Sequence, residues 1–405
     1  MGVSEVGVER LVRIERPATG GGVGRLDDGR VVFVRHCLPG ELVVVKLLDV
    51  ASTFARGDAV RVIEASADRV SAPCPYAHPG GCGGCDLQHA SDAAQREWKA
   101  SVVREHLSRI ARVDWDVSVA STGVEARGSR TRLRCAVDEA GRLSLRAARS
   151  HDLVSVDACW IAADALAEAF GTRWSDASEV ELRAIGHGEP FAVVRRHARD
   201  SRVEVRTLRG DPLSPATRST VVVGGVSFEV SAQSFWQSHA AAPSVLLDAV
   251  TSMAQARAGE RVVDLFCGVG LFSVPLAIAV GPSGHVSAVE SSPHAARDVR
   301  RNGDGLTNLT VREWSVSARS VNDVVTPGAV VVLDPPRTGL PRGVADALIR
   351  RRPSRVIYVS CDAATFARDV RTLAAGAFVL RDLRAFDLFP MTEHVELVGL
   401  LDFAA

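Results

Sequence analysis

The sequence predicts a multidomain protein: an N-terminal OB-like β-barrel, a central, mainly β domain and a C-terminal α/β domain of the Rossmann-like class. Short apolar segments punctuated by Gly and Pro fill roughly the first sixty residues, and residues 127–210 have mostly the character of strands. From about residue 221 onward, apolar strands alternate with helical stretches. A chain of 405 residues suits two or three domains, and we place them at 1–66, 67–215 and 216–405.

Composition narrows the class of protein. Hydrophobic residues make up 46% and charged residues 24%, which is ordinary for a globular protein, and no apolar run is long enough to span a bilayer. The N-terminal residues lack a basic segment followed by an apolar one, so we expect a cytoplasmic protein, and we expect a monomer. Only Lys46 and Lys99 are lysines, and arginine suits phosphate contacts, although a GC-rich genome gives the same bias.

Three segments before residue 65 predict the small barrel. The stretch "GGVGRLDDGRVVFV" carries an Asp-Gly hairpin signal between apolar runs, and "LPGELVVVKLLDV" and "GDAVRVIEAS" supply further strands. A helix is expected over 91–111, because Ser91 can cap it and Trp98, Val102 and Leu107 recur at helical spacing. A further helix is expected near 162–170.

The stretch "ERVVDLFCGVGLFSVPLAIAV" predicts a strand, a glycine turn and a helix, which is a nucleoside-binding arrangement. Gly268 and Gly270 let the backbone approach a ligand, and Glu290 at the end of the next strand can accept hydrogen bonds from ribose hydroxyls. NAD is the rival ligand, but the third small residue of its fingerprint is replaced by Ser273 beside the bulky Phe272. A cofactor without phosphates, such as S-adenosylmethionine (SAM), is therefore favoured.

The last seventy or so residues carry the candidate chemistry. Asp334 ends a strand and precedes two prolines, and ligand sites gather at such strand ends. Cys361 stands where a strand meets a helix, so we expect the helix N-terminus to lower its pKa; the alternative is a buried structural cysteine. Glu396 interrupts an apolar strand, which suggests function or an ion pair, whereas Glu393 in the preceding turn is expected to be solvated.

A nucleophilic thiol, a carboxylate and a methyl donor together suggest methylation of uracil at C5. Attack of Cys361 on C6 would make C5 nucleophilic, so that C5 can take the methyl group. Glu396 would then remove the C5 proton as a general base, and β-elimination would free the thiol.

Three of the eight cysteines fall within "CPYAHPGGCGGC". In a reducing compartment, Cys74, Cys82 and Cys85 indicate a metal or redox site rather than a disulfide. A fourth ligand is needed, and four thiolates suit either zinc or a [4Fe–4S] cluster, while His78 or His89 could complete a zinc site.

Two surface features could contact a nucleic acid. Arg130, Arg132 and Arg134 alternate and so share one face of a strand, where they either contact phosphates or form a solvated face. Phe235 and Trp236 are candidates for stacking on an unpaired or flipped base.

Taken in order, these motifs resemble those of the RNA uracil-C5 methyltransferases, specifically the iron–sulfur branch that acts on large-subunit ribosomal RNA. The resemblance rests on residues 5–64, which look like a TRAM domain, and on "CGGCDLQH", "SAQSFWQ", "DLFCGVG", "AVES", "LDPPRTGL", "VIYVSCDAATFARD" and "FPMTEHVE". It covers nearly the whole chain. It implies an RNA substrate, with ribosomal RNA favoured and transfer RNA as the alternative.

The resemblance also implies roles for individual residues. Gln237 would contact the cofactor or the base, and Phe266, Glu290 and Asp334 would line the SAM and uracil site. Cys361 would be the nucleophile and Glu396 the base. Cys159 would be the fourth ligand of a [4Fe–4S] cluster held by Cys74, Cys82 and Cys85. The implied catalytic sheet has seven strands, one of them antiparallel and near the C-terminus.

The chain departs from the family pattern at several positions. Leu271 replaces a frequent Asn, Asp362-Ala363 replaces the usual Asn-Pro, and a cofactor-contact position falls on Ser315. Seven residues instead of the common five separate Cys74 from Cys82. The other hypotheses are an RNA-binding iron–sulfur protein without activity, which intact Cys361 and Glu396 argue against, and a radical enzyme, whose C-x3-C-x2-C pattern is absent.

Overall fold

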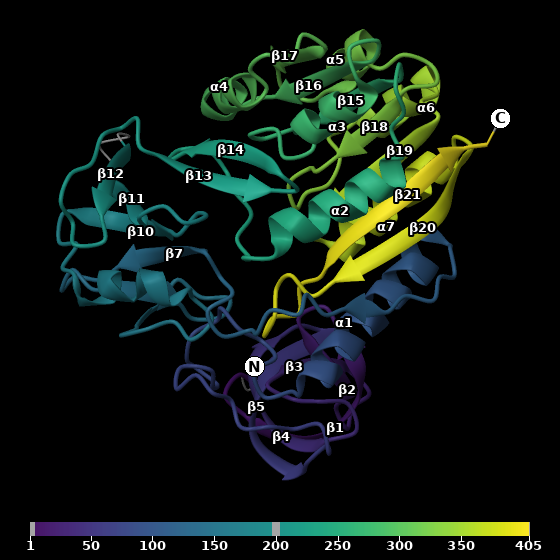
Figure 1. The fold of residues 1–405 in the computed structure, drawn as a ribbon. Helices are drawn as coiled ribbons and strands as arrows, with labels where there is room; N and C mark the ends of the chain where they lie inside the picture. Colours follow the sequence, from purple (N-terminus) through teal and green to yellow (C-terminus); the bar gives the residue numbers. More distant parts are fainter. Residues whose placement is uncertain (1–4, 197–202, 405) are drawn as a thin grey trace.

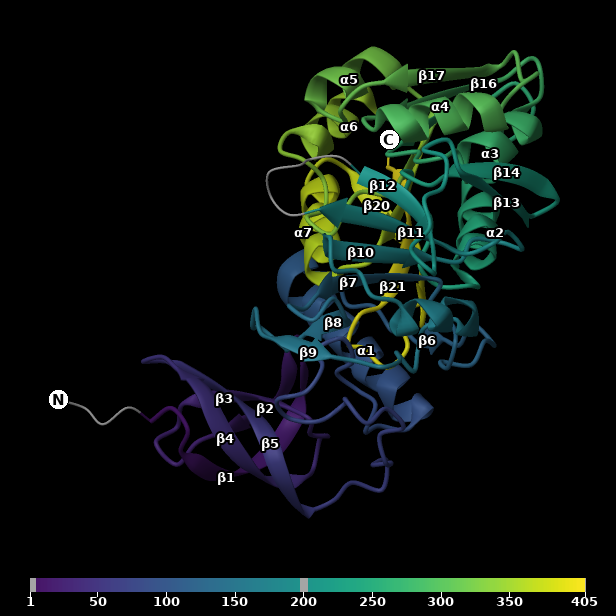
Figure 2. The ribbon, with the colours of Figure 1, turned by 90° about the vertical axis from the view of Figure 1, so that its left-hand side faces the viewer.

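Figure 1 shows the computed structural model of the chain, which describes residues 5–196 and 203–404. Four sheets form it: a closed five-stranded barrel, a six-stranded sheet, a two-stranded hairpin and an eight-stranded sheet. Figure 2 shows the six-stranded sheet above the barrel and in front of the eight-stranded sheet. Within the described residues, no helix has both the length and the apolar character that crossing a membrane requires.

The N-terminal barrel is confirmed. Its strands are β1 (Glu9–Ala18), β2 (Gly21–Arg25), β3 (Val31–Arg35), β4 (Leu42–Val50) and β5 (Phe54–Glu64). They close in the order β1-β2-β3-β5-β4 around a core of alternating apolar residues. The expected Asp-Gly hairpin joins β2 to β3, with Gly29 at φ +85°, a conformation that glycine adopts without steric cost.

The expected helix over 91–111 is present as α1 (Asp92–His106) and a following π-helical turn, η1 (Leu107–Ala111). Its N-terminus is capped as expected, because the Ala94 amide donates to Ser91 Oγ at 3.3 Å. The packing differs from the domain boundaries expected at 67–215. Helix α1, η1 and the short strand β6 (Val119–Ala120) join the core of the eight-stranded sheet rather than that of the six-stranded sheet.

The central six-stranded sheet is antiparallel throughout, in the order β12-β11-β10-β7-β8-β9. Its strands are β7 (Arg132–Val137), β8 (Leu143–Arg146), β9 (Leu153–Ser155), β10 (Ala177–Arg183), β11 (Phe191–Arg196) and β12 (Val203–Thr207). The helix expected near 162–170 is a 3-10 helix, η2 (Asp164–Gly171), which packs over this sheet with the fully buried Trp174. The hairpin β13 (Arg218–Val223) and β14 (Val226–Ser231) then leads into the last domain.

The C-terminal sheet has the order β17-β16-β15-β18-β19-β21-β20-β6. Its strands are β15 (Arg261–Leu265), β16 (His285–Glu290), β17 (Leu309–Glu313), β18 (Val330–Leu333), β19 (Arg355–Ser360), β20 (Phe378–Phe386) and β21 (Glu396–Phe403), with β6 added at the edge. Strand β21 runs antiparallel to both of its neighbours, and the other described pairs are parallel. The implied antiparallel strand is therefore present, and β6 raises the implied seven strands to eight.

Helices cover both faces of this sheet. One face carries α2 (Ala242–Ala254), α3 (Ser273–Val280) and α4 (Pro293–Asn302); the other carries α1, α5 (Ala318–Val324), α6 (Val344–Arg351) and α7 (Ala363–Ala374). Successive residues of β18 serve the two faces in turn, since Val330 and Val332 lie in one core and Val331 and Leu333 in the other. The Rossmann-like α/β fold predicted from the alternating segments is confirmed.

Gly399→Ala tests how tightly β21 packs against α7. A β-carbon at Gly399 would lie 2.7 Å from Cζ of Phe366, a fully buried ring that has no room to move. We expect this overpacking to lower the free energy of unfolding by about 1–3 kcal/mol, measured by urea denaturation. Gly171→Ala is the matched control, because a β-carbon there meets no atom within 4 Å. Equal stability of the two variants would contradict this packing.

Candidate active site

Three functional side chains meet at one edge of the C-terminal sheet. Asp334 follows β18 and Cys361 follows β19, so both lie at carboxyl ends of parallel strands. Glu396 begins β21, and because this strand is antiparallel its first residue lies at the same edge. The register pairs Ser360 with Leu397, which places Cys361 and Glu396 as the next opposing residues on neighbouring strands. The structure thus brings the predicted nucleophile and base together.

The electrostatics of Cys361 differ from the expectation. Burial raises the pKa of its thiol to about 12, and the carboxyl group of Glu396 acts in the same direction, while Arg337 opposes them. The expected lowering by the helix N-terminus was wrong for this state of the protein. Cys361 precedes the N-cap residue Asp362, and it is the Asp362 carboxylate that accepts from a helix amide, that of Thr365, at 2.8 Å.

The carboxyl groups beside Cys361 are also shifted. Glu396 is 4% exposed, and burial raises its pKa well above the usual range, with a further contribution from Asp334. Burial raises the pKa of Asp334 to about 7. Among the described residues no cation lies within ion-pair distance of Glu396, so the ion-paired interpretation of this strand glutamate finds no support. Such perturbed groups, gathered at one place, are typical of catalytic sites.

The segment after β18 is held against α7 by a buried carboxylate, Asp369. Its Oδ2 accepts from the amide of Leu340 at 2.8 Å and from the hydroxyl of Tyr358 at 2.7 Å. Gly339, at φ +72°, is required here because a β-carbon would lie 2.5 Å from the same oxygen. Sequence reasoning missed Asp369 and Tyr358. Their contacts fix the loop that carries Asp334.

The glycine turn after β15 adopts a conformation suited to a ligand. Phe266, Gly268 and Gly270 all have positive φ, at +67°, +56° and +93°, which is unusual for a bulky residue such as phenylalanine. A β-carbon at Gly270 would meet Val299 at 2.7 Å, so this glycine is needed for packing. A β-carbon at Gly268 would meet no atom within 4 Å, so the space in front of this residue is open.

Glu290 lies beside this turn. Its Oε2 accepts from the amide of Gly268 at 3.0 Å, and its Oε1 accepts from the amide of Ser292 at 2.7 Å. The hydroxyl of Ser291 also donates to Oε1 at 3.4 Å, so Oε2 is the oxygen that keeps a lone pair for another donor. The predicted cofactor residues of β15 and β16 are therefore adjacent, and Asp334 is linked to them because its amide donates to the Leu265 carbonyl at 3.4 Å.

Gln237 reaches the same edge from the segment between β14 and α2. Its Nε2 lies 3.5 Å from Oδ2 of Asp334, at the outer limit for a hydrogen bond. The neighbouring aromatics divide into two kinds. Phe235 is 51% exposed, with the guanidinium of Arg132 5.2 Å from its ring, whereas Trp236 is 6% exposed and packs in the core. Trp236 was wrongly predicted to be free for base stacking; Phe235 is accessible.

A buried aspartate that sequence reasoning missed anchors this segment. Asp298 on α4 accepts from the hydroxyls of Ser231 and Ser234, each at 2.6 Å, and pairs with Arg301 at 2.8 Å. It is 0% exposed. The signal available in the sequence was an aspartate among the apolar positions of a helix, as with Glu396 in its strand.

The expected arginine ladder is present only in part: Arg132 and Arg134 share one face of β7 and are partly neutralised, whereas Arg130 precedes the strand and lines a cavity beside Cys159. Arg132 and Arg134 lie 2.8 Å and 3.4 Å from the carboxylate of Glu181 on β10, and Arg183 bonds the same carboxylate. Burial alone would raise the pKa of Glu181, but Arg132 and Arg183 hold it at about 2. The side chain of Arg134 remains 55% exposed.

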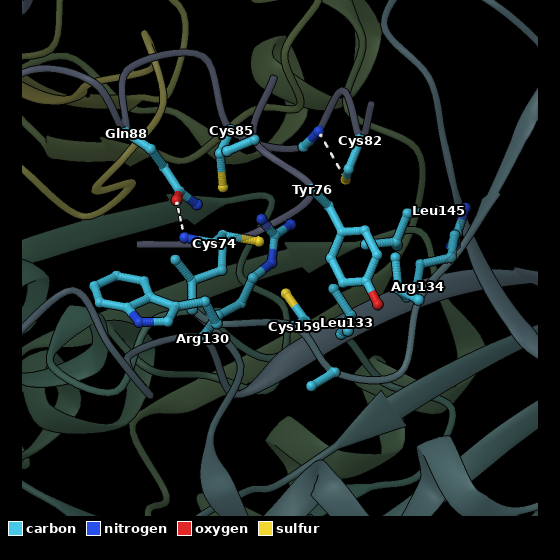
Figure 3. A pocket seen from close by; sticks show the side chains of 16 residues that line it. Cys74, Tyr76, Cys82, Cys85, Gln88, Arg130, Leu133, Arg134, Leu145 and Cys159 are labelled. Carbon is cyan, nitrogen blue, oxygen red and sulfur yellow. Dashed lines mark hydrogen bonds between the residues drawn. The ribbon is translucent and has the colours of Figure 1, made fainter. Parts of the chain in front are cut away.

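The four predicted cysteine ligands line one cavity of about 180 Å³ between the 74–90 segment and the central sheet. Figure 3 shows the sulfur atoms of Cys74, Cys82, Cys85 and Cys159 turned toward this common space. The segment is held by local hydrogen bonds, because the Cys74 amide donates to Gln88 Oε1 at 3.1 Å. All eight cysteines of the chain are free, so no disulfide competes for these thiols.

The histidines near the cavity do not complete a single-ion site. Among the described residues, no group of three or more His, Cys, Asp or Glu side chains is close enough to hold one metal ion. Neither His78 nor His89 lines the cavity, and a ring nitrogen of each lies near a backbone carbonyl oxygen instead. Burial raises the pKa of Cys82, of Cys159 and of Cys85, the last to about 12.

Glu393 is not solvated as expected. The amide of Gly20 in the barrel donates to its Oε2 at 2.5 Å, and burial raises the pKa of Glu393 to about 7. The turn before the catalytic edge is thus in direct contact with the N-terminal barrel.

Comparisons with known proteins agree with this arrangement. The TRAM domain family matches residues 3–60, and the tRNA (Uracil-5-)-methyltransferase family matches residues 324–403. An uncharacterized RNA methyltransferase of Streptomyces avermitilis is 36% identical over 433 residues, covering 99% of each chain. The 23S rRNA (uracil(1939)-C(5))-methyltransferase RlmD of Halomonas elongata is 34% identical, covering 95% of this chain and 87% of its own.

A solved structure has the same fold. It is that of the Pyrococcus abyssi tRNA (uracil-54, C5)-methyltransferase in complex with S-adenosyl-L-homocysteine, with a TM-score of 0.71, 23% identity, and coverage of 96% of this chain and 100% of that chain. The fold, the order of the motifs and the similarity over the full length all indicate the same family. The chain belongs to the RNA (uracil-5-)-methyltransferases, SAM-dependent enzymes that methylate C5 of uracil in RNA, and it carries an N-terminal TRAM domain.

Proposed function

We propose that this enzyme methylates a uridine of 23S ribosomal RNA through a covalent bond between Cys361 Sγ and uracil C6. The observation that carries the mechanism is the register of β19 and β21, which sets Cys361 opposite Glu396 at the edge that also holds the glycine turn. The ribosomal target is supported by the Halomonas relative, whose printed substrate is 23S rRNA. The alternative substrate is tRNA, as named for the structurally similar archaeal enzyme.

The residues divide the reaction between them. Cys361 Sγ adds to C6, and the electron pair of the C5–C6 bond moves toward C5, which becomes nucleophilic. SAM, when bound, supplies the methyl group that C5 takes. Glu396 then removes the C5 proton, and the returning electron pair expels the thiolate, so that the bond between Sγ and C6 breaks. The methylated RNA is then no longer covalently bound to the enzyme.

The shifted protonation states suit these roles. Glu396 is a strong base once it is ionised, because burial disfavours its charged form. Arg337 is the cation whose charge acts on both Cys361 and Glu396 in the direction of ionisation. We propose that Arg337 stabilises the attacking thiolate, and that Gln237 and Asp334 orient the uracil ring at the end of β18.

The cofactor residues form a second group at the same edge. Glu290 Oε2 keeps a lone pair for a ribose hydroxyl, and the open space in front of Gly268 leaves room for the nucleoside. Phe266, held at positive φ, would pack against the bound cofactor. We propose that RNA approaches over Phe235, whose exposed ring can stack on a base while Arg132 and Arg134 contact phosphates.

We propose that Cys74, Cys82, Cys85 and Cys159 hold a [4Fe–4S] cluster. The four thiols surround a cavity without lying close enough for one ion. A tetrahedral zinc ion would draw its sulfur ligands to about 3.8 Å from one another, given Zn–S bonds of about 2.3 Å. A four-iron cluster separates its thiolates more widely and suits the arrangement better. It would tie the 74–90 segment to the central sheet, a structural role, because the proposed reaction transfers no electrons.

Trapping with RNA that contains 5-fluorouridine tests the nucleophile and the substrate together. Fluorine at C5 is not removed as a proton is, so the wild-type enzyme should form a stable adduct with a 23S rRNA fragment, seen on denaturing gels. Cys361→Ala should form none. Glu396→Gln should trap even unmodified uridine RNA, since adduct formation needs only the thiol. Equal trapping of tRNA would favour the alternative substrate, and an adduct with Cys361→Ala would refute the mechanism.

The pH dependence of trapping tests the thiol. Because the pKa of Cys361 is raised to about 12, the thiolate fraction should increase about tenfold per pH unit between about pH 7 and pH 9, and the rate of trapping with it. Glu396→Gln should shift the profile toward lower pH, because the Glu396 carboxyl group contributes to the raised pKa. Single-turnover rates provide the measurement. A flat profile would show that the thiol is already ionised in the complex.

Metal analysis tests the cysteine cavity. Protein purified anaerobically should contain about four iron and four sulfide per chain. Cys85→Ala should lose iron and bind RNA more weakly, because its thiol lines the cavity. Cys37→Ala is the matched control, since this cysteine lies in the barrel core, and it should keep its iron. Zinc without iron, or a Cys85→Ala variant that binds RNA normally but does not methylate it, would contradict the proposal.

A further inference from the structure

The segment between β20 and β21, residues 387–395, ends one position before Glu396, and we call it the base loop. A single peptide bond joins the last residue of the base loop to Glu396, so the position of the loop determines where the backbone of Glu396 lies. Two side chains of α1, Gln95 and Lys99, are four residues apart and therefore share one face of the helix. Both point at the base loop.

Lys99 holds the first half of the base loop. Its Nζ lies 2.5 Å from Oδ1 of Asp387 and donates to the carbonyl of Phe389 at 2.9 Å. Lys99 is 0% exposed, and the Asp387 side chain is 11% exposed. The Asp387 amide in turn donates to the Ala120 carbonyl of β6 at 2.9 Å, which ties the start of the base loop to the sheet edge.

Gln95 holds the second half. The amide of Met391 donates to its Oε1 at 2.8 Å, and its Nε2 donates to the carbonyl of Ala90 at 3.0 Å. The carbonyl of Met391 accepts from the amide of Leu87 at 2.9 Å. Met391 has φ +66°, a conformation that non-glycine residues keep only where surrounding contacts impose it. Alternate residues of the base loop are thus fixed by α1 and by the segment before it.

A fully buried lysine is costly, and a buried ion pair contributes little net stability compared with apolar side chains of similar size. A buried ion pair can offset this cost when it fixes the surrounding chain in one conformation among several. Lys99 contacts the base loop at two points and is one of two lysines in a chain whose other 46 basic residues are arginine. Its compact ammonium group reaches the Asp387 carboxylate and the Phe389 carbonyl at the same time.

We propose that Lys99 is a positioning residue for the catalytic base. Through Asp387 and Phe389 it fixes the position of the base loop, and the base loop in turn directs the Glu396 carboxylate toward the C5 proton. This inference rests on the proposed function. Cys361 directly follows β19 and lies outside the base loop. Loss of the contacts between Lys99 and the base loop should therefore slow proton removal more than adduct formation.

Lys99→Met removes the charge and keeps the length of the side chain. With labelled SAM and unmodified RNA, we expect turnover to fall about tenfold to a hundredfold, the effect typical of a misplaced catalytic group. KM for RNA should change by no more than about twofold, and a methylated protein–RNA adduct should accumulate on denaturing gels. A purely structural defect would reduce adduct and product together. Lys46→Met is the matched control, because this other lysine is exposed on the barrel and should behave as wild type.

Two further variants make the outcome decisive. Gln95→Leu removes the contacts to Met391 and should produce the same accumulation if Lys99→Met does not fold. Glu396→Gln is run in parallel and separates the two hypotheses. If Glu396→Gln fails to trap RNA, the proposed mechanism is wrong. If it traps RNA while Lys99→Met and Gln95→Leu turn over normally, or lose adduct and product equally, only the positioning role is refuted.

Discussion

The structure depends on the direction of one strand. In an open parallel sheet the carboxyl ends of strands supply the functional residues, and β18 and β19 do so here through Asp334 and Cys361. Strand β21 enters between β19 and β20 in the opposite direction and contributes its first residue, Glu396, to the same edge. Residues opposite each other on antiparallel strands have α-carbons about 4.5–5.5 Å apart. This spacing holds the thiol of Cys361 and the carboxyl group of Glu396 side by side at the edge of the sheet.

The same edge has a common electrostatic character. Burial raises the pKa of Asp334, Glu396 and Cys361 alike, so the site favours neutral forms in the free protein. A sulfonium ion brought to such a place gains favourable interactions with the acidic groups and in turn favours their ionisation. Arg337 acts in the same direction on both Cys361 and Glu396.

Much of this was predictable because the signals are local. Alternating apolar residues, the Asp-Gly turn and the Ser91 cap identified the barrel and the first helix, and strand ends predicted the candidate residues that the structure brings to one sheet edge. What escaped prediction depends on contacts between distant segments. Glu393 is buried by Gly20, 373 positions away, and Trp236 enters the core through packing that no short motif reports. The expected thiol pKa was wrong for the same reason, since it counted the adjacent helix but not burial.

The contact between Gly20 and Glu393 has a mechanical consequence. The barrel touches the catalytic half at the turn between β1 and β2, and the ion pair between Arg16 and Glu105 at 2.7 Å adds a second point of attachment to α1. Two attachments at different places prevent a domain from swivelling about either one. The barrel is thereby held at one distance and in one orientation relative to the sheet edge that carries Cys361.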